Sequence, residues 1–240
     1  MSDFSQFNQF NYIRRRGRMT PAQQRAYGTV ANNIIIDADA AAQTIHSNSI
    51  SSQESGSKPS TGIGVEIGFG MGQALVDWAQ HNPSWQLFGI ELYQPGIGKL
   101  CDQLDKLDIV NVAVIEQPAQ EVLQTLPAHA IDEIRIFFPD PWPKKRHFSR
   151  RLIQPEFVQQ LAQVTKLNGL IHLATDWQPY AAWMRECFAQ HTSFTQVLDE
   201  TREPDRKTGA QDRPETKFEQ RGERLGHLIT DLKYTLSKSS

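Results

Sequence analysis

Residues 63–72 read Ile-Gly-Val-Glu-Ile-Gly-Phe-Gly-Met-Gly, and this segment decides the fold class. The apolar run Ile63–Ile67 predicts a buried strand that carries one acidic residue, Glu66. Three alternate glycines follow and predict a tight turn that a ligand can approach closely: Gly68, Gly70 and Gly72. A helical pattern then runs from Gln73 to His81. Strand, glycine-rich turn and helix form the unit from which parallel α/β sheets are built.

The same alternation of strand and helix patterns continues toward the C-terminus. The expected strands are Trp85–Glu91, Val112–Ile115, Ile131–Phe138 and Leu170–Thr175, and the expected helices are Gly96–Leu107, Ala119–Leu126, Pro155–Val164 and Pro179–Phe188. Two β-rich runs, Phe194–Leu198 and Leu228–Leu236, flank a long charged loop. The repeats predict an α/β fold with a doubly wound, mostly parallel sheet. The last two runs add an antiparallel C-terminal pair and bring the sheet to seven strands.

The residues before the first core strand divide into two parts. Residues 1–37 hold four arginines at positions 14–18, and Thr20 with Gln23 then predicts a capped helix start. Residues 38–62 are rich in Ser, Ala, Gln and Gly and contain no Phe, Trp or Tyr, so we expect a flexible linker. Residues 63–240 form the expected α/β domain.

Composition narrows the class of protein. Hydrophobic residues make up 39% of the chain and no apolar run approaches 18 residues, so we expect no membrane span. The polar N-terminus lacks the apolar core of a secretory signal, and the two cysteines form no close pair. We therefore expect a cytoplasmic protein. The net charge of −2 excludes a general polyanion binder but not local basic patches.

Acidic residues mark the ends of four expected strands: Glu66, Glu91, Asp140 and Asp176. Ligands of open α/β sheets bind beyond the carboxyl ends of the strands, where these residues should meet. A carboxylate such as Glu66 repels pyrophosphate but suits a cation, and S-adenosylmethionine carries an ammonium and a sulfonium. Glu91 is suited to accept hydrogen bonds from a ribose diol. The competing interpretations are a glycine-rich turn without a ligand and a solvated strand-end glutamate.

Residues 137–151 read Phe-Phe-Pro-Asp-Pro-Trp-Pro-Lys-Lys-Arg-His-Phe-Ser-Arg-Arg. Three prolines within five residues predict a stiff loop, which holds Asp140 beside Trp142. Five Lys or Arg follow within eight residues. Such a run is more often a solvated face, and Trp142 is suited either to stack on a base or to pack on its own loop. Together with a strand-end acid and an aromatic ring, however, the run indicates a site that binds a base belonging to a polyanion.

Six segments of the chain, several of them long and specific, resemble the motifs of one known family: residues 16–20, 65–72, 89–91, 137–142, 174–180 and 216–222. From about residue 14 to the end, apart from residues 38–62, the chain resembles the bacterial tRNA (guanine-N7)-methyltransferases. The resemblance implies the class I methyltransferase sheet and S-adenosylmethionine as cofactor. It also implies methylation of guanine N7 in the variable loop of tRNA. It leaves open the oligomeric state, monomer or homodimer, and the choice of tRNAs.

The resemblance also implies residue roles. Cofactor contacts fall on Glu66, Glu91 and the glycine turn, and the catalytic aspartate, also beside the cofactor, on Asp140. Substrate and RNA contacts fall on Lys144, Arg146, His147, Arg150, Arg151, Asp176, Thr216, Lys217, Phe218 and Glu219. The chain departs from the family at one place, because Pro118 stands where an aspartate usually lies near the adenine. Adenine recognition then falls to backbone groups or Gln117. No metal site is expected, because the histidines are scattered.

The expected chemistry needs no proton abstraction, because guanine N7 carries an available lone pair. Asp140 either stabilises the charge that develops on the purine or holds its N–H edge. Lys144 and the arginines after it hold phosphates. Residues 216–221 form either a lid over the substrate or an ordinary polar connection. Two other functions stay open: an adenine amino-methyltransferase, because Asp140-Pro-Trp resembles the Asp/Asn-Pro-Pro-aromatic loop of those enzymes, and a non-catalytic RNA-binding protein with this fold.

Overall fold

The computed structural model of the chain describes residues 17–54, 62–203 and 217–237. Their strands are β1 (Gly62–Ile67), β2 (Trp85–Ile90), β3 (Val112–Ile115), β4 (Ile131–Phe137), β5 (Thr165–Thr175), β6 (Phe194–Arg202) and β7 (Ile229–Leu236). Their helices are α1 (Pro21–Thr29), α2 (Ala31–Ile34), α3 (Ala38–Glu54), α4 (Gln73–His81), α5 (Gln94–Lys106), α6 (Ala119–Thr125), α7 (Pro155–Val164), α8 (Gln178–Ala189) and α9 (Lys217–Arg224). A 3₁₀ helix, η1, spans Lys145–Arg150.

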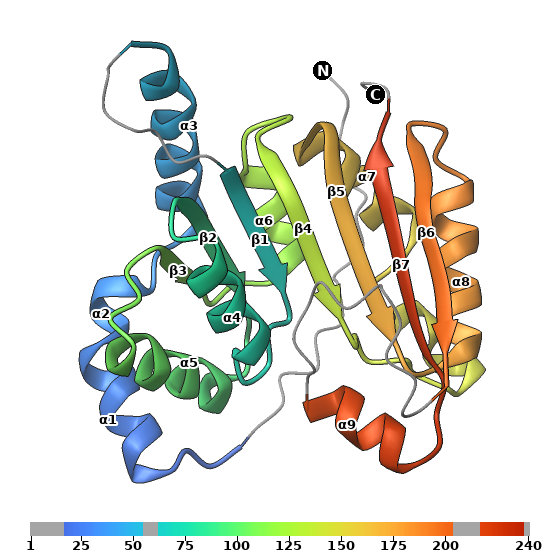
Figure 1. The fold of residues 1–240 in the computed structure, drawn as a ribbon, viewed down its shortest axis with the longest axis horizontal. Helices are drawn as coiled ribbons and strands as arrows, with labels where there is room; N and C mark the ends of the chain where they lie inside the picture. The colour runs from blue at the N-terminus through green and yellow to red at the C-terminus, as the bar shows by residue number, and fades with distance from the viewer. Residues whose placement is uncertain (1–16, 55–61, 204–216, 238–240) are drawn as a thin grey trace.

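The strands form one seven-stranded sheet in the order β3-β2-β1-β4-β5-β7-β6 (Figure 1). Strands β1 to β5 pair in parallel, and β7 runs antiparallel between β5 and β6. This confirms the doubly wound, mostly parallel sheet with an antiparallel C-terminal pair. The strand order reverses beside β1, whose neighbours are β2 and β4. The crevice beyond the carboxyl ends of these three strands is where such sheets bind ligands.

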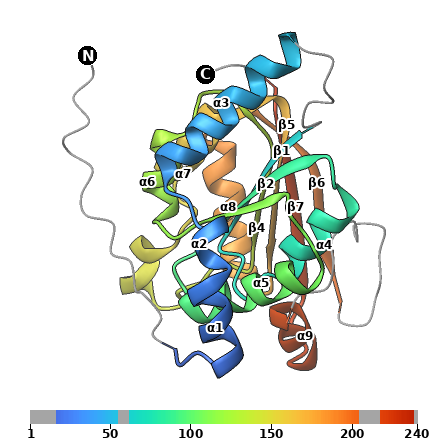
Figure 2. The same ribbon diagram turned by 90° about the vertical axis from the view of Figure 1, so that its left-hand side faces the viewer.

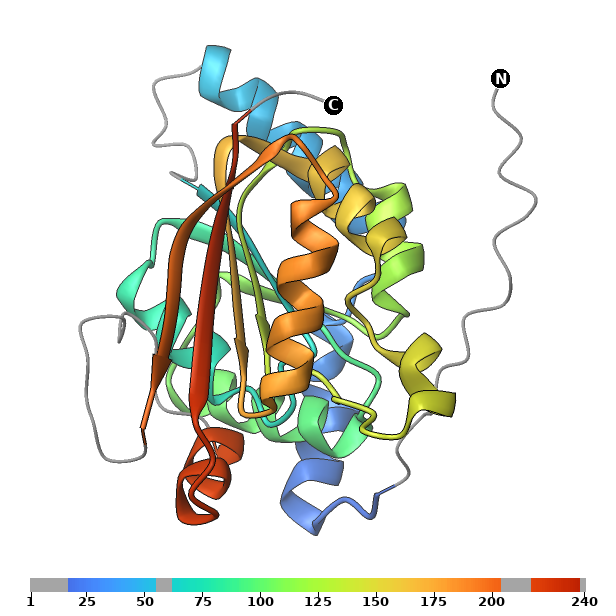
Figure 3. The same cartoon turned by 90° about the vertical axis from the view of Figure 1, so that its right-hand side faces the viewer.

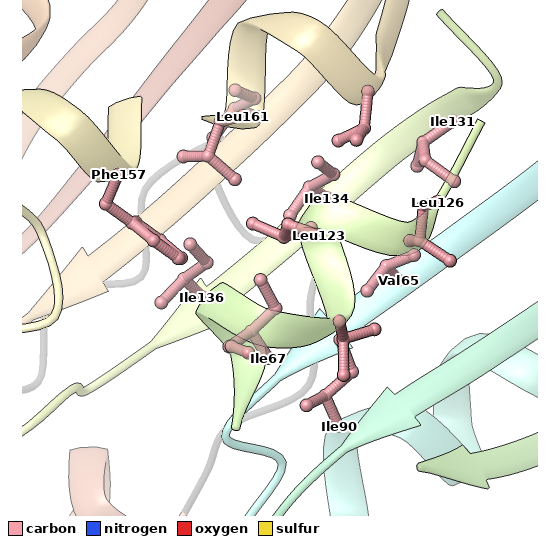
Figure 4. Packing of buried hydrophobic residues seen from close by; sticks show 14 of the residues in the cluster. Val65, Ile67, Ile90, Leu123, Leu126, Ile131, Ile134, Ile136, Phe157 and Leu161 are labelled. Atoms are coloured by element: carbon pink, nitrogen blue, oxygen red, sulfur yellow. The ribbon is translucent and has the colours of Figure 1, made fainter. Parts of the chain in front are cut away.

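Helices cover both faces of the sheet. Buried side chains of α3, α6, α7 and α8 share one apolar cluster with one face of β1 and β4, as Figure 4 shows for Val65, Ile134 and Leu161. Helices α4 and α5 pack with α1 in a second cluster on the other face of β2 and β3. Figure 3 shows α7 and α8 on one side of the strands and α4 on the other. Apolar alternation along the strands explains the two layers.

The prediction of a flexible linker was wrong for residues 38–54, which form helix α3. Its side chains Ala41 and Ile45 are fully buried in the cluster that contains α6 and α7. Figure 2 shows α3 running beside α6 and α7. Alanines are strong helix formers, and their spacing with Ile45 supplies an apolar stripe that composition alone conceals. Residues 55–61 of the expected linker lie outside the described part of the chain.

Helix α1 begins at the expected capping box. The Thr20 hydroxyl accepts a hydrogen bond from the Gln23 N–H, and the Gln23 side chain accepts one from the Thr20 N–H. The helix then packs on α5, where the Gln23 amide donates to the Pro95 carbonyl at 3.1 Å. The segment before the sheet is thereby attached to the domain beside the carboxyl edge. Within the described residues, no helix has the length and apolarity needed to cross a membrane.

Candidate active site at the carboxyl edge of the sheet

The turn after β1 has the backbone that its glycines predict. Gly68, Gly70 and Gly72 have φ values of 75°, 56° and 81°, a left-handed conformation that other residues adopt at a cost. A Cβ built on Gly68 meets nothing within 4 Å, so the turn is open on that side. A Cβ on Gly96 would lie 1.9 Å from the Gly70 carbonyl oxygen, so α5 closes the turn from the other side. The turn therefore leaves its Gly68 side open to the approach of a ligand.

Glu66 is a buried acid beside this turn. Its side chain is 3% exposed, and its Oε2 has no hydrogen-bond partner among the described residues. Burial raises the pKa of Glu66 to about 8, nearby Arg135 opposes that rise, and Glu91 adds to it. A buried carboxyl with an unused oxygen at the mouth of a glycine turn suits a cationic ligand, which would lower the cost of ionising it. The residues present therefore fit S-adenosylmethionine.

Glu91 follows β2 and lies next to the same turn. Its Oε2 accepts a hydrogen bond from the Gly70 N–H at 2.8 Å, and its Oε1 accepts bonds from the N–H groups of Leu92 and Tyr93 at 2.7 and 3.0 Å. These bonds fix the carboxylate and tie the glycine turn to the start of α5. A carboxylate has about four acceptor positions, so with three bonds made there is room for roughly one hydroxyl of a diol. The expected ribose contact stays a prediction.

The end of β3 holds contacts that sequence reasoning missed. The Gln117 carboxamide oxygen accepts a bond from the Ala38 N–H at 2.8 Å, so this side chain holds the start of α3. Glu116 accepts hydrogen bonds from Tyr27 of α1 and Gln94 of α5. Because Glu116 directly follows a strand of a parallel sheet, the strand-end argument used for the other acids could have found it. Pro118 precedes α6 as its N-cap residue.

The loop after β4 is strained as well as stiff. Phe138 and Trp142 have φ values of 51° and 42°, a left-handed conformation that costs bulky residues about 1–3 kcal/mol each. The Phe138 N–H donates to the Ala174 carbonyl at 2.8 Å and anchors the loop to β5. Asp140 is exposed at the centre of the loop. The backbone therefore holds a solvent-facing carboxylate beside the glycine turn, because β1 and β4 are neighbours.

The expected phosphate contact of Arg151 does not agree with the structure. Its side chain is 3% exposed, and its Nε donates to the Pro141 carbonyl at 2.9 Å. Its guanidinium carbon lies 3.8 Å from the ring centre of Phe148 and 4.9 Å from that of Tyr180. A long cationic run in sequence conceals which member turns inward. Arg151 supports the Asp140 loop from its buried side, where a phosphate cannot reach the guanidinium.

The other cations of this run face solvent. Lys144, Arg146 and Arg150 are exposed on or next to η1. Desolvation, together with the neighbouring Arg150, Arg146 and Lys144, lowers the pKa of His147 and favours its neutral ring. Trp142 packs on its own loop: the His147 ring meets its ring edge-on at 5.6 Å, and the Arg150 guanidinium carbon lies 5.1 Å from its ring centre. The structure thus supports the loop-packing interpretation of Trp142.

Asp176 follows β5 and contacts the segment after α9. Its Oδ2 pairs with Nδ1 of His227 at 3.1 Å. The expected substrate contact of Glu219 is not supported, because this residue is 1% exposed and forms an ion pair with the buried Arg202. Thr216 and the side chains of Lys217 and Phe218 lie outside the described part of the chain, as do the arginines at positions 14–16.

One edge of the sheet thus gathers the strand-end acids. Glu91 donates its N–H to Ile115 of β3, and Phe137 pairs in register with Ala174, which places the loops that carry Asp140 and Asp176 side by side. The four acids lie around the point where the strand order reverses. Among the described residues, no three His, Cys, Asp or Glu side chains group to hold a metal ion.

Solved structures similar to this chain share its fold. They include a 16S rRNA methyltransferase, KamB, with a TM-score of 0.58 and 16% identity, covering 85% of this chain and 95% of that one. A precorrin-6y C5,15-methyltransferase from Geobacter metallireducens has a TM-score of 0.52 and 14% identity, covering 80% of this chain and 87% of that one. These likenesses confirm the class I methyltransferase sheet.

Sequence comparisons extend the likeness to a family. Residues 60–232 match a family model described as "Putative methyltransferase". A tRNA (guanine-N(7)-)-methyltransferase of Nitrosococcus oceani is 41% identical over 96% of this chain and 92% of its own. Another, from Chromohalobacter salexigens, is 39% identical over 93% of this chain and 88% of its own. The resemblance found in the motifs is therefore confirmed. The chain belongs to the tRNA (guanine-N7)-methyltransferase family.

Proposed function

We propose that this protein transfers a methyl group from S-adenosylmethionine to N7 of a guanine in tRNA, forming N7-methylguanosine in the variable loop. The observation that carries the proposal is the exposed Asp140 in the loop after β4, the strand that neighbours β1 with its open glycine turn and buried Glu66. Family membership supports the same reaction. A substrate of this kind places the enzyme in the cytoplasm.

The cofactor lies along the carboxyl edge in this proposal. Glu66 faces its cationic part, the glycine turn approaches it closely, and Glu91 accepts from the ribose diol. S-adenosylmethionine supplies an electrophilic methyl group on its sulfonium. The unused Oε2 of Glu66 supports this placement, since an unpaired buried acceptor costs about 1–3 kcal/mol. The adenine of the cofactor then lies toward the end of β3, where the neighbouring residues are Glu116, Gln117 and Pro118.

Asp140 faces the guanine in this arrangement. The lone pair of N7 forms the new bond to the methyl carbon, and the electrons of the broken carbon–sulfur bond stay on sulfur. Positive charge thereby moves to the purine, and a fixed carboxylate stabilises it or holds the N–H edge of the base. The strained loop supports either role, because its backbone on both sides of Asp140 is held in an uncommon conformation. Exposed Lys144, Arg146 and Arg150 hold phosphates beside it.

The test combines two variants with nucleoside analysis. The protein and bulk tRNA are incubated with methyl-labelled S-adenosylmethionine, and the tRNA is then digested to nucleosides. We expect the label in N7-methylguanosine. Asp140→Ala should lower the rate of its formation by roughly 100-fold or more, while the tRNA affinity stays within about threefold of wild type. Asp105→Ala, which removes an exposed acid of α5, is the matched control and should keep full activity.

The other functions give different results in the same experiment. Label in N6-methyladenosine would identify an adenine methyltransferase instead. Tight tRNA binding, with no label and no S-adenosylmethionine binding by calorimetry, would identify a non-catalytic RNA-binding protein. Asp140→Asn separates the two roles of the carboxylate, because an amide keeps one acceptor for the N–H edge but loses the charge.

A further inference from the structure

Helix α9 lies at the carboxyl edge of the sheet, below the ends of β4 and β5 (Figure 1). Its Gly222 packs directly on Asp176, because a Cβ at that position would lie 3.1 Å from the Asp176 side chain. After the helix, His227 pairs with the same carboxylate at 3.1 Å. The helix is therefore attached to Asp176, the first residue after β5. The loop after β5 lies beside the loop after β4, which carries Asp140.

The two sides of α9 carry opposite charge. Glu219 and Glu223, one helical turn apart, both form ion pairs with Arg202, which is 5% exposed on β6. The acids of the helix are thereby turned inward and partly neutralised. Arg221 and Arg224 lie on the remaining side and are exposed. The inward pairing leaves a cationic outer surface next to the candidate site.

We propose that this outer surface, Arg221 and Arg224 of α9, binds phosphates of the tRNA on the Asp176 side of the acceptor site. The inference rests on the proposed function and adds a second anchoring surface to it. The first surface, Lys144 to Arg150, lies on the Asp140 side. Because β4 and β5 are neighbours, the two surfaces bracket the position of the target base. Contacts on both sides fix the register of a polyanion, which one patch alone cannot do.

Arginines in the last turn of a helix also have a simpler role, because they interact favourably with its C-terminal carbonyls. The Arg224 Nε donates to the Gln220 carbonyl at 3.2 Å, which fits that role for one of its nitrogens. A guanidinium has five N–H donors, so the remainder is available to a phosphate. The two roles differ in what salt does to tRNA binding, since only phosphate contacts release counterions from the RNA.

The test measures tRNA affinity against salt concentration for wild type and for the double variant Arg221→Gln/Arg224→Gln. Two lost contacts should reduce the slope of log Kd against log salt by about 1.5 and raise Kd roughly 30-fold at 0.1 M salt. The two proteins should converge near 1 M salt. The charge-preserving double variant Arg221→Lys/Arg224→Lys should keep most of the wild-type affinity for tRNA. Arg185→Gln on α8, whose guanidinium is already paired with Asp199, is the control and should keep the wild-type slope.

Two outcomes would overturn the inference. One is a wild-type slope and affinity in a folded Arg221→Gln/Arg224→Gln protein. The other is a fall in affinity equal at all salt concentrations and accompanied by a lower melting temperature, which would assign both arginines to helix stability. Formation of N7-methylguanosine at saturating tRNA is measured in parallel. If wild type forms none, the proposed function fails. If wild type forms it while the slopes agree, only the inference about α9 fails.

Discussion

Replacing Arg151 by Lys separates the two roles assigned to this residue. A phosphate contact tolerates the change, because the charge is kept. A buried support of the Asp140 loop does not, because Lys lacks the planar guanidinium that donates to Pro141 and lies against Phe148. We therefore expect Arg151→Lys to be less stable and slower, with unchanged dependence of tRNA binding on salt.

The contacts of Arg151 set the size of the effect. An unpaired buried acceptor at Pro141 costs about 1–2 kcal/mol, and the lost cation–π contact with Phe148 roughly another 1 kcal/mol. For a chain of 240 residues, 1 kcal/mol corresponds to about 2 °C in melting temperature. We expect a fall of roughly 4–6 °C. A loop displaced by about 1 Å should lower kcat by about 10- to 100-fold.

The assay combines thermal unfolding, single-turnover methylation and tRNA binding at several salt concentrations. Arg25→Lys, at an exposed position of α1, is the matched control and should match wild type in all three. The reasoning is refuted if Arg151→Lys melts and turns over like wild type while Arg151→Gln lowers the salt slope by about 1. That result would return Arg151 to the RNA-binding surface.

Four further predictions concern Glu66, the glycine turn and Gln117. At pH 7, S-adenosylmethionine binding should release up to about one proton from Glu66, measured by calorimetry in buffers of different ionisation enthalpy; Glu66→Gln should release none. Because the pKa of Glu66 is raised, the folded protein keeps a proton that the unfolded chain loses. Stability from this group should therefore fall as pH rises from 4.5 to about 8, and Glu66→Gln should flatten that part of the profile. Gly96→Ala should weaken S-adenosylmethionine binding at least 10-fold, since its methyl group would displace the Gly70 carbonyl, and an unchanged Kd would contradict the close approach. Gln117→Ala should lower the melting temperature by about 1–4 °C by removing the acceptor of the Ala38 N–H, with S-adenosylmethionine affinity within about twofold; a large loss of affinity would restore the expected adenine contact.

Local signals in the sequence were sufficient for the sheet and its ligand-binding edge. Apolar runs that alternate with helical patterns determine a parallel sheet, and glycines at alternate positions determine a left-handed turn, because both depend on residues close in the chain. The acids at the strand ends were predictable for the same reason, once the strands were known. Helix α3 was missed, because its apolar stripe is short and set among Ser and Gln, so composition alone indicated a linker.

The direction of each charged side chain was decided only by tertiary structure. Arg151 turns inward because Pro141, Phe148 and Tyr180 surround it, and Glu219 turns inward because Arg202 comes to it from β6. Neither partner set is visible in a local pattern, since a run of cations or a polar motif looks the same whichever member is buried. Local sequence signals were thus enough to propose the position of the site and the chemistry that it suits. The folded structure decides which of its charges face solvent and which hold the loops in place.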